Sequence, residues 1–396
     1  VAMPPNGGGS EASVLKCDGD VPASSSGNPP LAAFGTAVVS LVGAAAPPPP
    51  PLELPPLYDA HVDHVPHTCI HDELLADAPP SVASPQLHVS DVAERMGDMR
   101  RKRHALQNGE PIRVLLDTSK LSITQQVDVA DNGEPVACYS ASATLNSGYQ
   151  CSAADLLTPA KFEWLTNTLL PTAKAKIEEA LRVDRVAGNL VLRAQKCGFQ
   201  ERVTVPNAMR TTGVPYDLVI FVTARPIASE GTLAFAGECE HDQQTKRPLA
   251  GQLNYSPKSL KPDTALASQI GTTLHEIAHV LGFSKGKWGQ FYDVAAMNVK
   301  ARSAVISEAR NFAGKASTEL MTTSAVAQFV QAHFGCDTLA GAELEDGGSE
   351  GTAKSHWDKR VFMNEYMTGQ ASQNPVFSPL TLAMFADSGW DASGNL

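Results

Sequence analysis

The amino-acid sequence predicts an α+β fold in which a twisted mixed sheet packs against long helices. Residues 218–222 form a continuous run of branched and aromatic side chains, which indicates a strand buried on both faces. Residues 159–181 and 270–281 repeat apolar side chains at intervals of three and four residues, which is typical of helices with one buried face. At 396 residues the chain is long enough for two domains built from such elements.

The elements on either side of the central strand follow from the same patterns. Residues 111–116 are strand-like, and residues 232–237 are expected to form the edge of the sheet. The helix at residues 159–181 is expected to kink at Pro171, which has no N–H and whose ring clashes with the preceding turn. The apolar face of this helix contains Phe162, Leu165, Leu169, Ala173, Ile177 and Leu181.

The second helix contains the pattern that indicates the chemistry. Residues four apart lie on one face of a helix, about 6 Å from each other, so His275 and His279 can both reach one Zn²⁺ at about 2.0–2.1 Å. Glu276 lies on the rim of that face, where it is placed to take a proton from a zinc-activated water. The competing interpretation is a chance pair of histidines on an amphipathic helix. Its buried face contains Ile270, Leu274, Ile277 and Leu281.

The two ends of this helix favour the metal site. Pro262-Asp263-Thr264 supplies a plausible start, although Gly271 weakens the helical pattern slightly. Gly282 can adopt a positive φ, so the chain can turn sharply back towards the metal after the helix ends.

A zinc hydrolase needs three protein ligands and one open position, so a distant residue must supply the third. Downstream of the helix the histidines are His333 and His356. His333 ends an amphipathic pattern and is interpreted as structural or exposed, whereas His356 follows a polar, flexible stretch and precedes a turn that contains Met367. In an alternative class of zinc peptidase, the gluzincins, a glutamate such as Glu308 would be the third ligand; Gly282 and the methionine turn argue against it.

These residues together resemble the leishmanolysin family of metzincin peptidases. The resemblance rests on residues 275–283, on the long insertion before His356 with its segments 333–339 and 343–348, and on residues 380–390. It implies a metzincin-type zinc peptidase fold with an active-site helix and a long insertion between Gly282 and the third zinc histidine. An extended substrate main chain would pair with the edge strand at residues 232–237.

The resemblance also implies the roles of individual residues. His275, His279 and His356 would bind one Zn²⁺ per chain, and Glu276 would be the general base. Met367 would be the methionine of the turn that packs beneath the metal, where a soft side chain offers no competing charge.

A second segment of the chain is similar to the prosegment motif of this family. Residues 67–72 read His-Thr-Cys-Ile-His-Asp, and the thiolate of Cys69 would occupy the open zinc position and exclude the catalytic water. The chain would then be a latent proenzyme. Arg100-Arg101-Lys102-Arg103 offers a processing protease a place to cleave, and a charged linker is the alternative interpretation.

The seven cysteines favour an oxidising compartment. The resemblance pairs Cys138 with Cys151 and Cys197 with Cys239, each closing a surface loop. With Cys69 as the switch and Cys17 in the leader, Cys336 is left alone. In the family its equivalent pairs with a later cysteine-rich region, and this sequence stops at Leu396 before one, so a lost carboxy-terminal domain or a fragment is expected. The sequon at residues 254–256 is compatible with secretion.

Residues 1–66 form a low-complexity leader with glycine, serine and proline runs that cannot build a packed core. Within it, the apolar residues 31–42 and the small residues after them look like a signal-peptide core. This segment is short for a membrane span, so secretion is favoured over anchoring and membrane association is left open. The net charge is -11 without a basic stripe, which predicts no nucleic-acid partner.

The expected organisation has four parts. The leader at 1–66 precedes a prosegment with the cysteine switch at 67–103. An amino-terminal catalytic subdomain at 104–262 precedes the active-site helix, insertion, third ligand and methionine turn at 263–396. The expected function is a secreted or cell-surface zinc-dependent endopeptidase that cleaves proteins and peptides and is made as a latent proenzyme. The alternative is a non-catalytic adhesion or binding protein that retains a structural zinc.

Overall fold

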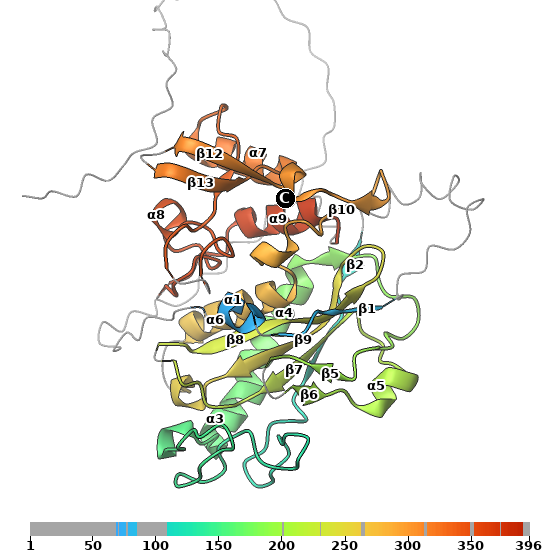
Figure 1. The fold of residues 1–396 in the computed structure, drawn as a ribbon, viewed down its shortest axis with the longest axis vertical. Coiled ribbons are helices and arrows are strands. Elements are labelled where there is room, and N and C mark those ends of the chain that lie inside the picture. Colours follow the sequence, from blue (N-terminus) through green and yellow to red (C-terminus); the bar gives the residue numbers. More distant parts are fainter. Residues whose placement is uncertain are drawn as a thin grey trace, which may run out of the picture. The chain divides into compact units, whose positions relative to one another are not determined.

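A mixed sheet lies at the centre of the computed structural model (Figure 1). Among the described residues its strand order is β1-β8-β9-β7-β3. Strand β8 runs antiparallel to β9, whereas the other neighbours are parallel. The strands are β1 (Val82–Ser84), β3 (Val114–Asp117), β7 (Leu218–Thr223), β8 (Ala234–Asp242) and β9 (Pro248–Tyr255).

The structure describes most of the chain after the leader. The described residues are 69, 71–76, 78–84, 109–199, 202–229, 231–262, 266–312, 315–348, 352–372 and 374–390, with the side chains of 72, 75, 76, 311 and 312 left out. They all belong to one compact unit, His64–Leu396. The leader at 1–66 with its signal-like segment and Cys17, and the basic run Arg100–Arg103, lie outside the described residues.

Both faces of the sheet are covered, which explains the unbroken apolar run of β7. Side chains alternate between the faces of a strand. Leu218, Ile220 and Val222 pack into the core under the helices, and Val219 and Phe221 pack into a second core on the other face. The second core is closed by residues 186–205, which include the small hairpin of β5 (Lys196–Cys197) and β6 (Val203–Thr204).

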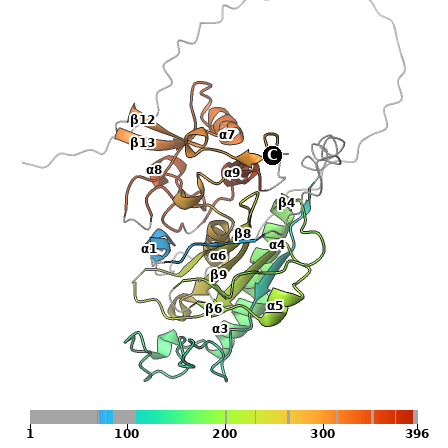
Figure 2. The ribbon, with the colours of Figure 1, turned by 45° about the vertical axis from the view of Figure 1, so that its right-hand side comes forward.

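Helix α6 (Leu266–Val280) is the helix with His275 and His279 that the sequence predicts, and it packs on β8 and β9. It is buried on nearly every side from Gln269 onwards, because the sheet, the segment that contains Cys69 and the insertion surround it. Figures 1 and 2 both show helix α1 (His71–Ala76) beside α6 and β8. The other helices before α6 are α3 (Pro159–Trp164), α4 (Leu170–Ala180) and α5 (Asn207–Thr211).

The expected kink at Pro171 takes the form of a π-helical segment. Residues Leu165–Leu169 connect α3 to α4, and the N–H of Leu170 donates to the carbonyl of Leu165. The wider turn relieves the clash that a proline ring makes with the carbonyl four residues earlier. The apolar face remains buried through this segment, as Leu165, Leu169 and Ile177 show.

The insertion between Gly282 and His356 forms a separate layer beyond α6 (Figure 1). Strands β12, β13 and β14 form an antiparallel sheet, and α7 packs on the closing helix α9. The elements of the insertion are β10 (Tyr292–Asp293), β11 (Asn298–Val299), β12 (Ile306–Phe312), β13 (Lys315–Met321), α7 (Ser324–Phe334) and β14 (Ala342–Glu343). Helices α8 (Lys359–Phe362) and α9 (Pro379–Ser388) follow His356.

Three details differ from the expectations. The strand expected at residues 111–116 is divided into β2 (Glu110–Pro111), which pairs with β4 (Arg182–Val183), and β3. The edge strand expected at 232–237 begins at Ala234 and continues to Asp242. Asn254 of the sequon is fully buried on β9, and its side chain bonds Thr223 and Arg225, so folded protein cannot present it for glycosylation. No helix within the described ranges is long and apolar enough to span a membrane.

Candidate metal centre

Three histidines meet at the carboxyl-terminal half of α6. The Nε2 atoms of His275 and His279 are 3.1 Å apart, and His356 Nε2 lies 3.2 Å from each of them. The thiol of Cys69 completes the group, with its Sγ 3.3 Å from His279 Nε2. All four side chains are buried. Cys69 and His279, which are 210 positions apart in the chain, therefore meet at this point.

Each imidazole is held by a backbone carbonyl. The Nδ1–H of His275 donates to Tyr366 O at 2.7 Å, that of His279 to Phe283 O at 2.6 Å, and that of His356 to Thr352 O at 2.8 Å. A carbonyl can only accept, so the proton of each neutral ring is on Nδ1 and the lone pair is on Nε2.

This arrangement fits a zinc ion. Three lone pairs aimed at one another in a buried site repel, and a cation between them removes that repulsion. Nitrogens bound tetrahedrally to zinc at about 2.05 Å are about 3.3 Å apart, close to the separations seen here. The Cys69 sulfur is a soft fourth donor of the kind zinc accepts. The donor set therefore suits Zn²⁺.

The environment of His279 favours the form that can ligate. Burial lowers the pKa of His279 well below its ordinary value, and the neighbouring His71, His275 and His356 lower it further. The imidazole is therefore neutral at physiological pH, as metal ligation requires.

Gly282 makes the turn that positions His279. Its φ is +100°, and the N–H of Gly282 donates to His279 O at 3.1 Å. The next residue, Phe283, presents its carbonyl to the His279 ring. A Cβ at position 282 would lie 2.5 Å from Cζ3 of Trp390, so only glycine fits. The glycine thus turns the chain back beneath the metal ligand.

The methionine turn supports the other two histidines. Met367 is fully buried, and its carbonyl accepts a hydrogen bond from the N–H of Trp357, the residue after His356. Tyr366 presents its carbonyl to His275. Gly369 lies against Thr352 and the His356 ring, with no room for a larger side chain.

Glu276 is buried beside the centre but does not belong to the clustered ligand group. Burial raises the pKa of Tyr255, whose hydroxyl is hydrogen-bonded to Thr273, and the nearby Glu276 raises it further. A carboxylate next to the ligands, on the same helix and outside the ligand set, is placed to exchange protons rather than to bind metal.

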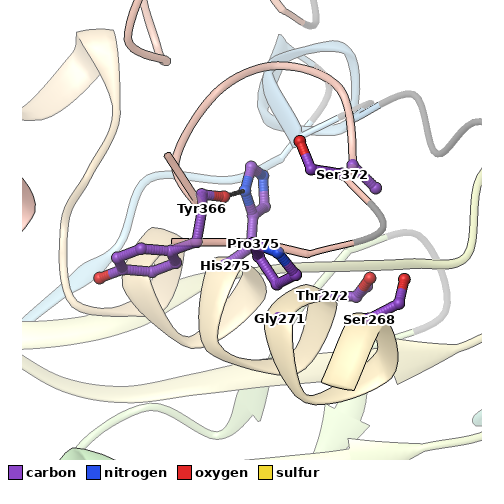
Figure 3. Close-up of a pocket in the computed structure, with 8 residues that line it drawn as sticks. Ser268, Gly271, Thr272, His275, Tyr366, Ser372 and Pro375 are labelled. Carbon is purple, nitrogen blue, oxygen red and sulfur yellow. Dashed lines mark hydrogen bonds between the residues drawn. The ribbon is translucent and has the colours of Figure 1, made fainter. Parts of the chain in front are cut away.

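A pocket opens beside His275 (Figure 3). One wall is the first half of α6, and the other is the loop after the methionine turn. A Cβ at Gly271 would lie 2.4 Å from Pro375 Cγ, so the glycine that weakens the helical pattern is what lets this loop approach the helix. The pocket is lined by Ser268, Gly271, Thr272, His275, Tyr366, Ala371, Ser372 and Pro375.

Sequence reasoning did not assign His71 a place at the centre. Its ring stacks on His279 with centroids 4.0 Å apart and planes inclined by 6°. Its Nδ1 donates to the carbonyl of Ala236 on β8 at 2.5 Å. The sequence feature that could have indicated this position is the second histidine of the motif at residues 67–72, two residues after Cys69.

The other candidates lie elsewhere. Glu308, the alternative third ligand, is on β12, where it contacts Ser317 and Arg310 and is outside the histidine cluster. His333 is exposed near the end of α7 and stacks on Phe329.

The cysteines require one correction. The structure contains disulfides between Cys138 and Cys151 and between Cys197 and Cys239, the pairs that the resemblance implies. Cys336 is not left alone as expected, because it is disulfide-bonded too.

This chain is similar in sequence to a family of known proteins. The family model for leishmanolysin matches residues 67–393. The leishmanolysin-like peptidase of Drosophila pseudoobscura pseudoobscura is 38% identical over 205 residues, covering 44% of this chain and 30% of that protein. That of Caenorhabditis briggsae is 31% identical over 306 residues, covering 59% and 46%. Leishmanolysin of Leishmania major is 27% identical over 381 residues, covering 91% and 58%.

Two histidines on a buried helix, a third after a long insertion and a methionine turn beneath them define a metzincin-like zinc peptidase site. The chain belongs to the leishmanolysin family, whose model matches most of its length. It spans between about a third and somewhat more than half of these three relatives, from 30% to 58% of their lengths.

Proposed function

We propose that this protein is a zinc-dependent endopeptidase that is held latent by its own prosegment. The observation that supports this most directly is the set of three Nε2 atoms within 3.2 Å of one another, each fixed by a carbonyl on its Nδ1. His275, His279 and His356 would hold the metal, and Glu276 stands beside them without joining the ligand group.

The chemistry divides between metal and protein. Bound zinc supplies a Lewis acid that polarises the scissile carbonyl and makes a nearby water more acidic. Glu276 accepts the proton from the attacking water and later passes it to the leaving amine. Burial strengthens the electrostatic interactions of the Glu276 carboxylate with the water and the amine, because the site excludes bulk water.

The substrate would be an extended stretch of protein or peptide. The outer edge of β8 beside the centre can pair with a main chain of any sequence, which favours endopeptidase action. The pocket beside His275 would take a side chain next to the scissile bond.

Latency would come from the segment around Cys69. Its sulfur lies 3.3 Å from His279 Nε2, in the place a water would need, and Thr352 Oγ1 donates to the Cys69 carbonyl at 3.2 Å. Cleavage at Arg100–Arg103 would release it. The two disulfides Cys138–Cys151 and Cys197–Cys239 support synthesis in an oxidising compartment, and we propose a secreted or cell-surface location.

Variants of the processed chain test the proposal, with casein cleavage and bound zinc measured on the same samples. Glu276→Gln should retain one zinc and lose about 10²–10⁴-fold in rate, because only the proton acceptor is removed. His356→Ala should lose zinc as well as activity.

His333→Ala, which changes an exposed histidine, is the matched control and should alter neither property. Full activity of Glu276→Gln, or unchanged zinc binding by His356→Ala, would refute the assigned roles. Stable zinc with no cleavage by the unaltered chain would favour the non-catalytic binding protein.

A further inference from the structure

The prosegment contacts the sheet at a second place, away from the metal centre. Strand β1 runs parallel to the outer edge of β8, with Val82 opposite Glu240, Ala83 opposite His241 and Ser84 opposite Asp242. Figures 1 and 2 show β1 along β8 beyond helix α1. The ladder ends with the N–H of Gln243 donating to Ser84 O at 2.7 Å.

Side chains add specific contacts to this ladder. The Ser81 hydroxyl is hydrogen-bonded to His241 Nδ1 at 2.8 Å. The Ser84 hydroxyl is fully buried and bonds the carboxylate of Glu240, which also accepts from the backbone N–H groups of Arg193 and Ala194. Between the serines, Val82 packs on the core of the outer face of the sheet. The segment is therefore recognised by its side chains as well as by its main chain.

A bulge separates this place from the metal centre. The register of β8 with β9 shifts between Glu238 and Glu240 and again before His241. A bulge bends a strand and increases its local twist, so one straight peptide cannot continue the ladder across it. The edge near Ala236, where His71 binds, and the edge at Glu240–Asp242 are thus two separate docking surfaces.

We infer that the outer edge of β8 at Glu240–Asp242 is a binding site of its own for an extended segment of the Ser-Val-Ala-Ser kind in parallel orientation, and that it holds the prosegment independently of Cys69. This inference rests on the proposed latent form, but the binding itself needs neither catalysis nor metal.

The consequence is an inhibitor attached at two points. A short connection between α1 and β1 keeps Cys69 at a high effective concentration over the centre, and a second attachment of this kind can raise binding 10²–10⁴-fold. Loss of the β1 contacts should therefore expose the Cys69 thiol even though Cys69 itself is unchanged.

Hydrogen exchange on the intact chain tests this. In Cys69→Ala, the amides of residues 82–84 and 240–243 should remain protected as in the unaltered chain. In the double variant Ser81→Ala and Ser84→Ala, the same amides should exchange at least tenfold faster than in the unaltered chain. Pro80→Ala, at an exposed position just before the strand, is the control and should change nothing.

The reactivity of the Cys69 thiol gives a second readout. Alkylation of Cys69 by iodoacetamide should be at least tenfold faster in the serine double variant than in Pro80→Ala. Loss of protection at 240–243 in Cys69→Ala, or alkylation unaffected by the serine changes, would overturn the inference. Neither readout requires proteolysis, so a failure of the proposed enzyme activity would leave the test intact.

Discussion

At the scale of single residues, the centre depends on backbone carbonyls that no motif names. Tyr366, Phe283 and Thr352 each present a carbonyl to one of the ligand rings. Every residue has a backbone carbonyl whatever its side chain, so the amino-acid type at these positions gives no signal. What matters is the turn that aims the carbonyl, and one of these turns depends on Gly282.

We predict that Gly282→Ala costs about 2–4 kcal/mol of unfolding free energy and weakens zinc binding. The positive φ at this position is unfavourable for a residue with a Cβ, and the added methyl group would clash with Trp390. The backbone displacement that relieves this clash should move the Phe283 carbonyl that holds His279. Urea unfolding and zinc titration would measure both effects.

Gly335 provides the matched control for this substitution. It also has a positive φ, +62°, at the end of α7, but a Cβ there would meet nothing within 4 Å. Gly335→Ala should cost only about 1–2 kcal/mol and leave zinc affinity unchanged. Equal costs for the two alanines would show that the contact with Trp390 is unimportant.

At the scale of elements, a chain of hydrogen bonds joins α9 to the two segments that support the histidines. Trp357 Nε1 donates to Thr381 Oγ1 at 3.0 Å, and Thr381 Oγ1 donates to Glu365 Oε1 at 2.8 Å. Ser378 N donates to the other carboxyl oxygen at 3.2 Å. Trp357 follows a ligand and Glu365 begins the methionine turn, so α9 fixes both.

We predict that Glu365 makes the folded protein less stable as the pH rises. Burial raises the pKa of Glu365 from its ordinary 4.5 to about 7. Between these values the folded state keeps a proton that the unfolded state has lost, so stability is highest below pH 4.5 and is lost as the pH rises through 7. The effect should reach about 2–3 kcal/mol between pH 5 and pH 8.

The comparison with Glu365→Gln isolates this group, because glutamine keeps a carbonyl acceptor for Thr381 and does not titrate. Urea unfolding of both zinc-loaded proteins would give the difference in unfolding free energy at each pH. The unfolding free energy of the glutamine variant should increase relative to that of the unaltered protein as the pH rises. A difference that stays constant from pH 5 to pH 8 would contradict the raised pKa.

At the scale of the whole molecule, the centre is made by segments from three parts of the chain. The segment before β1 supplies Cys69 and His71, α6 supplies two histidines, and the region after the insertion supplies His356. Release of the segment before β1, as we propose, would remove none of the three histidines. Its release should therefore open the centre and preserve the metal site.

We predict that cleavage at Arg100–Arg103 turns casein hydrolysis on while the zinc content stays at one per chain. The physical reason is that release uncovers both the fourth zinc position and the β8 edge. Zinc analysis and casein assays before and after cleavage would check this. Equal activity in both forms would contradict a latent state.

The local part of the fold could be predicted because it follows from short-range periodicity. The apolar run of β7 and the apolar spacing of α6 each reflect contacts that every segment of that type must make. The π-helical segment before Pro171 was beyond such reasoning, because a proline clash can be relieved by a kink or by a wider turn, and packing chooses between them.

Local sequence patterns were enough to predict the buried strand, the helix with two histidines and a carboxylate, the glycine after it and the residues from which a third ligand could come. Long-range packing established that His356 rather than Glu308 joins the cluster, that His71 covers His279, and that Asn254 is buried. Periodicity records which face of a segment is buried, whereas these facts depend on which segments pack against each other across long stretches of chain.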